Sequence, residues 1–207
     1  MPYSKYNRRD FVRSKYIYED VDVLVNFLGI KDQKILERFE ADVTYQRQLM
    51  LEKEDYVKGR FSKSHLKNIH KFIFQDVYPF AGHFRTESVF KVTNGVRTDF
   101  CRSEHIVSQL DELLQNLRKE KYLKGLKFEN YIVRLAHYMN ELNLIHPFPE
   151  GNGRSIREYI RELALKSNYK IHWSRLNKDE LLDAMIRAAN GDLMRLEKCL
   201  KKSIIDN

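Results

Sequence analysis

Residues 146–157 read His146-Pro-Phe-Pro-Glu-Gly-Asn-Gly-Arg-Ser-Ile-Arg157, and most of the information on architecture and chemistry lies in this stretch. It places a base, a carboxylate, two glycines separated by one residue and two arginines in twelve consecutive positions. Taken singly, such features are common: His-Pro often ends a helix, Gly-x-Gly often forms a turn, and arginines three residues apart often lie on a solvated helix face. Together they indicate a phosphate-binding site with a base beside it.

Both flanks of this stretch have helical periodicity. Apolar residues before it recur every three or four positions, which predicts a helix over Glu129–Ile145 that ends just before His146. Apolar residues after it predict a second helix beginning near Arg154. At the N-terminus of that helix, unpaired backbone N–H groups and the helix dipole attract anions, and Gly151 and Gly153 allow a close approach. We therefore expect a phosphate-bearing ligand.

The side chains of the stretch suit phosphoryl-type transfer chemistry. Arg154 and Arg157 share a helix face and can grip neighbouring phosphate groups. Glu150 suits Mg²⁺, which takes few protein carboxylates and fills its shell with water and phosphate oxygens. Asn152 can donate to a phosphate oxygen. His146, whose ordinary pKa is near neutrality, suits removal of a proton from an attacking hydroxyl.

The pattern His146-x-Phe-x-Glu-Gly-Asn-Gly-Arg-x-x-Arg157 resembles the signature of Fic (filamentation-induced-by-cAMP) domains at every fixed position. This resemblance implies a helical-bundle Fic fold and transfer of AMP from ATP to a hydroxyl of a target protein. In the Doc branch, which transfers phosphate instead, the glycine positions differ, so Gly151 and Gly153 favour nucleotidyl transfer. The implied roles are His146 as the base, Glu150 as the Mg²⁺ ligand, Gly151, Asn152 and Gly153 as the phosphate cradle, Arg154 and Arg157 as the triphosphate clamps, and Phe148 as a buried anchor.

Composition favours one mainly α-helical domain over residues 1–207, with an N-terminal helical region at 1–60 and a core at 61–207. The chain is 43% hydrophobic and has only four prolines and eight glycines. No apolar run is long enough to span a membrane, and the polar, basic N-terminus is unlike a secretory signal. Two distant cysteines predict reduced thiols in a cytoplasm, and the family resemblance implies that this cytoplasm is bacterial.

The net charge of +8 raises the question of nucleic-acid binding. The sequence contains no helix-turn-helix, zinc-finger or aromatic-basic RNA signature, so we do not expect a nucleic-acid partner. Part of the excess charge can serve ATP or an acidic protein.

A β-hairpin is predicted between Ser88 and Phe100, because two loosely alternating segments flank Asn94-Gly95. Its unpaired edge could accept an extended segment of a target protein as an added strand. The Fic family has such a flap beside its active site, and residues 78–85 resemble the stretch that leads into it. The alternative is a purely structural hairpin. The proposed docking residues are Ser88, Val89, Phe90, Lys91, Val92 and Thr93.

Other helices are expected at Lys34–Leu51, Ser64–Val77 and Ile106–Leu117, where apolar residues recur at helical spacing. Met185 and Met194 are expected to fill gaps in the core. The histidines other than His146 show no metal-ligand spacing and receive no role.

Regulation is suggested by the family resemblance. Many Fic proteins are inhibited by a helix with Ser/Thr-x-x-x-Glu-Gly/Asn, whose glutamate pairs with the second arginine. Here the only Ser/Thr-x-x-x-Glu is Ser108 to Glu112, followed by leucine. Residues 18–40 resemble bacterial toxin-type Fic proteins, including relatives of secreted effectors delivered into other cells. Either the chain is constitutively active, or a separate small antitoxin supplies a glutamate to Arg157.

Two readings of function remain beside adenylyl transfer. The chain could be a non-catalytic nucleotide- or partner-binding regulator, against which the intact His146 argues. It could also use another nucleotide donor, since the signature contacts phosphates and says little about the base.

Overall fold

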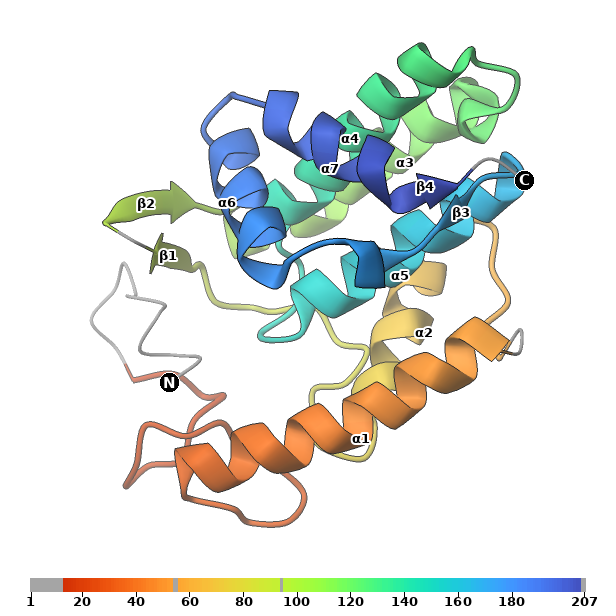
Figure 1. Cartoon of the computed structure of the whole chain (residues 1–207). Coiled ribbons are helices and arrows are strands. Elements are labelled where there is room, and N and C mark those ends of the chain that lie inside the picture. The colour runs from red at the N-terminus through yellow and green to blue at the C-terminus, as the bar shows by residue number, and fades with distance from the viewer. Residues whose placement is uncertain (1–12, 54–55, 94, 206–207) are drawn as a thin grey trace.

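The computed structural model describes residues 13–53, 56–93 and 95–205 and is mainly helical, with two small antiparallel sheets (Figure 1). This confirms the predicted fold class. The helices are α1 (Gln33–Lys53), α2 (Lys63–Phe74), α3 (Ile106–Lys119), α4 (Phe128–Ile145), α5 (Asn152–Lys166), α6 (Lys178–Ala189) and α7 (Met194–Ser203). The strands are β1 (Phe90–Thr93), β2 (Val96–Asp99), β3 (Lys170–Ile171) and β4 (Ile204–Ile205).

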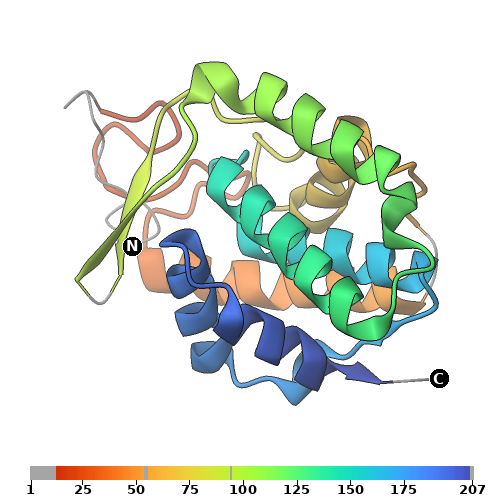
Figure 2. The same cartoon turned by 90° about the horizontal axis from the view of Figure 1, so that it is seen from above.

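Helix α4 forms the centre of the bundle. It packs against α3, α5, α6 and α7, and Figure 2 shows it between α3 on one side and the C-terminal helices on the other. Its inward residues are almost fully buried, including Tyr131, Leu135 and Met139. Burial of such side chains is the main driving force for helix packing. The apolar periodicity that predicts α4 therefore corresponds to the residues that pack against its neighbouring helices.

The layers below α4 position the loop at residues 146–151. Helix α5 packs against both α4 and α2, and α2 in turn packs against α1 at the edge of the molecule (Figure 1). The N-terminus of α2 is capped by Ser62, whose side chain accepts a hydrogen bond from the backbone of His65. The chain reversal between α4 and α5 thus lies above α2, with α1 nearby.

The N-terminal region is less helical than expected. Within the described part of residues 1–60, the helix covers only Gln33–Lys53, and residues 13–32 form turns with an isolated bridge between Ile17 and Leu24. Helix α1 begins after Asp32, whose carboxylate accepts from the backbone N–H groups of residues 34 and 35. Its inner face contains Leu36 and Thr44.

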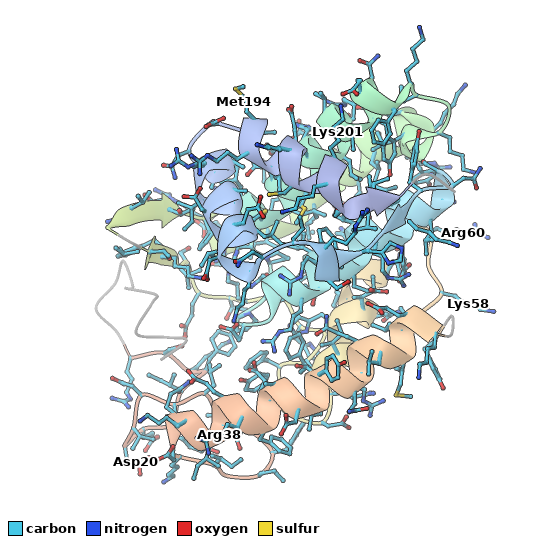
Figure 3. All side chains as sticks on the ribbon, in the orientation of Figure 1. Asp20, Arg38, Lys58, Arg60, Met194 and Lys201 are labelled. Carbon is cyan, nitrogen blue, oxygen red and sulfur yellow. The ribbon has the colours of Figure 1, made fainter. Side chains whose placement is uncertain are left out.

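Spacing predicts some buried residues wrongly. Within the helix expected at Lys34–Leu51 from its recurring apolar residues, Ile35 is 57% exposed and Tyr45 is 59% exposed. Met194, the first residue of α7, is 77% exposed rather than in the core (Figure 3). Single exposed apolar residues are common on protein surfaces, so spacing alone does not identify the buried ones.

The predicted hairpin is present as β1 and β2, which pair from Phe90 with Asp99 to Thr93 with Val96 and project from the bundle (Figure 1). Of the predicted Asn-Gly turn, Asn94 lies outside the described residues, and Gly95 has φ +76°. The guanidinium of Arg97 lies 3.9 Å from the Phe90 ring centroid. In the described part of the chain, no helix is long and apolar enough to cross a membrane.

Candidate active site

The stretch 146–157 links α4 to α5 through a tight reversal, and we call residues 146–151 the motif loop. Helix α5 begins at Asn152, two residues earlier than predicted, so the N–H groups of residues 152–154 have no intrahelical acceptor. His146 closes α4 in the left-handed conformation, with φ 47°. Gly151 begins α5 with φ +79°. The loop therefore presents a helix N-terminus beside a histidine, as the sequence predicts.

The two glycines of the stretch have different structural roles. A Cβ at Gly151 would lie 2.2 Å from Cζ of the buried Phe74, so only glycine fits there. A Cβ at Gly153 would meet only the Nη1 atom of Arg157, at 3.4 Å. Gly151 thus lets the loop pack closely on α2, whereas the exposed Gly153 leaves the first turn of α5 open to solvent.

Asn152 fastens the loop rather than contacting a phosphate through its side chain. Its Oδ1 accepts from the backbone N–H of Phe148 at 2.8 Å, and its Nδ2 donates to the Phe148 carbonyl at 2.7 Å. The residue is 2% exposed. The expected side-chain contact with phosphate is therefore replaced by a structural role, and the backbone N–H of Asn152 is the group that can face an anion.

Phe148 is fully buried, as predicted, and stacks on His70 with ring centroids 3.8 Å apart. His70 Nδ1 accepts from the Gly82 N–H at 2.8 Å, so the proton lies on Nε2, which donates to the Glu150 carbonyl at 2.9 Å. Burial lowers the pKa of His70 to about 3. The spacing of the histidines indicates no role for His70, yet this neutral side chain connects the motif loop to α2 and to the segment before the flap.

His146 is held as a neutral proton acceptor. Its Nδ1 lies 3.2 Å from the Asn143 carbonyl, which can only accept, so Nδ1 carries the proton and Nε2 is the basic nitrogen. The ring stacks on Phe100 at 3.8 Å. Burial, followed by the charges of Arg85 and Lys91, lowers the pKa of His146 to about 3. The imidazole is therefore unprotonated at neutral pH and able to take a proton.

Arg85 is a second residue, after His70, that supports the motif loop and that the sequence analysis does not identify. Arg85 is 2% exposed, and its guanidinium donates to the carbonyls of His146, at 2.7 Å, and Ile145, at 3.2 Å. These carbonyls lie at the end of α4, where intrahelical donors are lacking. Arg85 thereby stabilises the left-handed turn that orients the His146 ring.

Glu150 lies beside Arg154 and Glu40 at the start of α5. Arg154 Nη2 is 2.6 Å from Glu40 Oε1 and 3.9 Å from Glu150 Oε1. Burial, and then the charge of Glu40, raises the pKa of Glu150. A divalent cation would stabilise the buried Glu150 carboxylate and would reduce its repulsion by Glu40. One carboxylate beside a phosphate cradle suits Mg²⁺. The residues present therefore fit the expected metal.

Arg157 occupies a different environment from Arg154. Within residues 13–53, 56–93 and 95–205, the Arg157 side chain has no hydrogen-bond acceptor and no carboxylate partner. Burial, followed by the charge of Arg154, lowers the pKa of Arg157 to about 10, so the guanidinium stays charged at neutral pH. A half-buried cation without a counterion favours an anionic ligand.

The flap lies next to this site, and its proposed docking residues differ in how far their side chains are exposed. Ser88 anchors its base by accepting from the Ser103 backbone N–H at 3.1 Å, and Val89 and Phe90 are buried. The charge of Lys91 lowers the pKa of His146, which places β1 beside the base. Val92 is 44% exposed and Thr93 is half-buried. Of the six proposed docking residues, Ser88, Lys91, Val92 and Thr93 therefore have side chains at least partly outside the core.

Comparison with known proteins agrees with this geometry. The Fic/DOC family model matches residues 60–164, which include α2, the flap, the motif loop and most of α5. The chain belongs to the Fic/DOC family. It is 32% identical over 192 residues to the "Probable protein adenylyltransferase Fic" of Escherichia coli, covering 93% of this chain and 92% of that protein.

Two further Fic/DOC proteins resemble the chain, one in sequence and one in structure. The protein adenylyltransferase VbhT of Bartonella schoenbuchensis is 39% identical over 181 residues, covering 86% of this chain and 37% of VbhT. The chain thus spans little more than a third of that relative. The crystal structure of the BepC protein of Bartonella tribocorum with bound AMPPNP superposes with a TM-score of 0.84 at 23% identity, over 93% of this chain and 97% of BepC. That likeness confirms the Fic fold.

Proposed function

We propose that the chain is a protein adenylyltransferase that transfers AMP from Mg-ATP to a Ser, Thr or Tyr hydroxyl of a target protein. The observation that carries this proposal is the pairing of a neutral His146, basic at Nε2, with the helix N-terminus and the unpartnered Arg157. The names of two relatives, "Protein adenylyltransferase VbhT" and "Probable protein adenylyltransferase Fic", support it. An intact base argues against a regulator that only binds nucleotide.

The proposed reaction assigns one task to each group. The target hydroxyl oxygen attacks the α-phosphorus, its proton passes to His146 Nε2, and the bond from the α-phosphorus to the bridging oxygen of the β-phosphate breaks, releasing pyrophosphate. The N–H groups at the start of α5 and the guanidinium of Arg157 hold the phosphate oxygens. Glu150 would hold Mg²⁺, which when bound neutralises charge on those oxygens.

ATP labelled at the α- or the γ-phosphate tests the direction of transfer. Adenylyl transfer puts the α-label on protein and leaves the γ-label in pyrophosphate. Transfer of the γ-label to protein would contradict the proposal and would indicate the Doc-type reaction. The same assay with UTP, GTP and CTP compares nucleotide donors.

Arg157→Ala is expected to weaken ATP binding about ten- to hundredfold, because a charge-assisted contact to phosphate is lost. The same change should leave the melting temperature of the nucleotide-free protein unchanged or higher, since it removes a partly buried charge that has no carboxylate partner. Titration with ATP and thermal unfolding measure the two effects.

Arg161→Ala is the matched control. Arg161 pairs with Glu158 at 2.6 Å on the same helix. Its loss should lower the melting temperature and leave ATP binding unchanged. Equal loss of ATP affinity in both variants would contradict the assigned role of Arg157.

For the target, we propose docking of an extended segment along β1 at Lys91, Val92 and Thr93. Within the described residues β1 pairs only with β2, and main-chain bonding at a strand edge is largely independent of side-chain identity. A Val92→Pro variant, which lacks one main-chain donor, should modify a target protein more slowly while binding ATP normally. An unchanged rate would exclude this docking mode.

For regulation, we propose that a separate small antitoxin in the bacterial cytoplasm contributes a glutamate to Arg157. The unpartnered Arg157 supports this arrangement, as does the family resemblance of residues 18–40. Titration of the chain with the product of a neighbouring small gene should inhibit transfer. Unchanged activity at saturation would exclude the proposal.

A further inference from the structure

Helix α1 contacts the motif through Arg154, which is fixed on three sides. Arg154 Nη2 donates to Glu40 Oε1 at 2.6 Å, and Nη1 donates to Thr44 Oγ1 at 3.0 Å. The guanidinium also lies 4.6 Å from the ring centroid of Phe74. Arginine and its two polar partners are 110 and 114 residues apart in sequence, so the contact is a product of the tertiary fold.

The two partners on α1 are themselves held in place. The Thr44 hydroxyl donates to the Glu40 carbonyl at 2.7 Å, which turns its lone pairs toward Arg154. The second carboxylate oxygen of Glu40 accepts from the hydroxyl of Tyr78, a residue 1% exposed. Glu40 therefore presents Oε1 to Arg154 in one orientation.

This arrangement separates Arg154 from Glu150. Nη2 of Arg154 is 3.9 Å from Glu150 Oε1, beyond hydrogen-bond distance, because Glu40 holds it at 2.6 Å. Without Glu40, the nearest carboxylate to the guanidinium is that of Glu150. A carboxylate engaged by arginine is a poorer ligand for a divalent cation.

We infer that Glu40 and Thr44 are positioning residues that keep Arg154 off the Glu150 carboxylate and so leave that carboxylate available to Mg²⁺. The inference rests on the proposed function, in which Glu150 holds the metal of Mg-ATP. It adds a role for α1, which lies outside the residues matched by the family model.

Glu40→Gln should affect ATP binding differently in the absence and in the presence of Mg²⁺. In EDTA, ATP should bind as tightly as to wild type or more tightly, because one negative charge near the phosphate site is gone. With Mg²⁺, the released Arg154 should compete for Glu150. The Mg²⁺ concentration for half-maximal binding should therefore rise about ten- to hundredfold, the usual effect of losing an outer-shell partner. Loss of packing alone would weaken both measurements in parallel.

The test is a titration of a trace fluorescent ATP analogue at fixed protein concentration, in EDTA and over a Mg²⁺ series, with thermal unfolding as a check on folding. Asp42→Asn removes the same charge from the exposed side of α1, where Arg38 also lies (Figure 3), and should match wild type. Thr44→Val removes only the second acceptor of Arg154 and should shift the Mg²⁺ midpoint in the same direction by less.

An unchanged Mg²⁺ midpoint in Glu40→Gln and Thr44→Val, with normal wild-type binding, would overturn the inference and leave the proposed function standing. Parallel weakening with and without Mg²⁺ would also overturn it. Failure of the wild-type chain to bind Mg-ATP at all would overturn the proposed function itself.

Discussion

His146→Ala is expected to lower AMP transfer about 10²–10⁴-fold, the usual contribution of a positioned general base, while ATP binding stays near the wild-type level. In the proposed reaction His146 Nε2 accepts the proton, whereas the N-terminus of α5 and Arg157 would hold the phosphates. The effect is therefore on the rate of transfer and not on nucleotide affinity. Rates with labelled ATP and affinities from titration separate these quantities.

Two further variants support the interpretation. His146→Asn keeps a residue that tolerates the left-handed backbone at φ 47°, so its inactivity would not reflect misfolding. His105→Ala removes an exposed histidine outside the site and should be fully active. Equal losses of ATP affinity and transfer in His146→Ala would show that the residue acts in binding instead of as the base.

Gly151→Ala is expected to destabilise the protein by about 2–5 kcal/mol, the sum of the left-handed backbone cost and of overpacking. The added Cβ would lie 2.2 Å from Cζ of Phe74, a fully buried ring that cannot move aside without disturbing α2. For a chain of this size, the change corresponds to a drop of about 4–20 °C in melting temperature. ATP binding should fall with it, because the N-terminus of α5 shifts.

Gly153→Ala is the matched control for this prediction. Its Cβ would contact only the flexible end of Arg157, at 3.4 Å, in a helical backbone. Its melting temperature should be equal to or higher than that of wild type. Similar destabilisation by both substitutions, measured by thermal unfolding, would contradict the close packing of the motif loop on Phe74.

The sequence predicts the local features of the structure well. Helices α1 to α5 and the hairpin follow from residue spacing and from Asn94-Gly95, because periodicity and turn chemistry act over a few residues. The motif loop at the junction of α4 and α5 was predicted for the same reason. The start of α5 differs from the prediction by two residues because Asn152 and Gly153 are poor helix formers in isolation. In the structure the Asn152 side chain accepts from the backbone N–H of Phe148, which joins the first turn of the helix to the motif loop.

The parts that were missed are contacts over long sequence distances. His70 binds the Glu150 carbonyl 80 residues away, and Arg85 binds the His146 carbonyl 61 residues away. No spacing rule reports such pairs in a single sequence. The contact of Glu40 with Arg154 is equally unpredictable from sequence, since a glutamate on a helix is most often solvated. The side-chain role of Asn152 was misassigned because an amide that can donate to phosphate can also bond a nearby backbone.

The central claim is that His146 catalyses transfer of AMP to protein hydroxyls, and intact-mass analysis tests it most directly. A bacterial lysate and the purified chain are each incubated with Mg-ATP and either the wild-type protein or His146→Ala. We predict that the mass of one AMP group is added to a protein only in the presence of the wild type. No added mass despite bound ATP, or equal addition with His146→Ala, would contradict the claim.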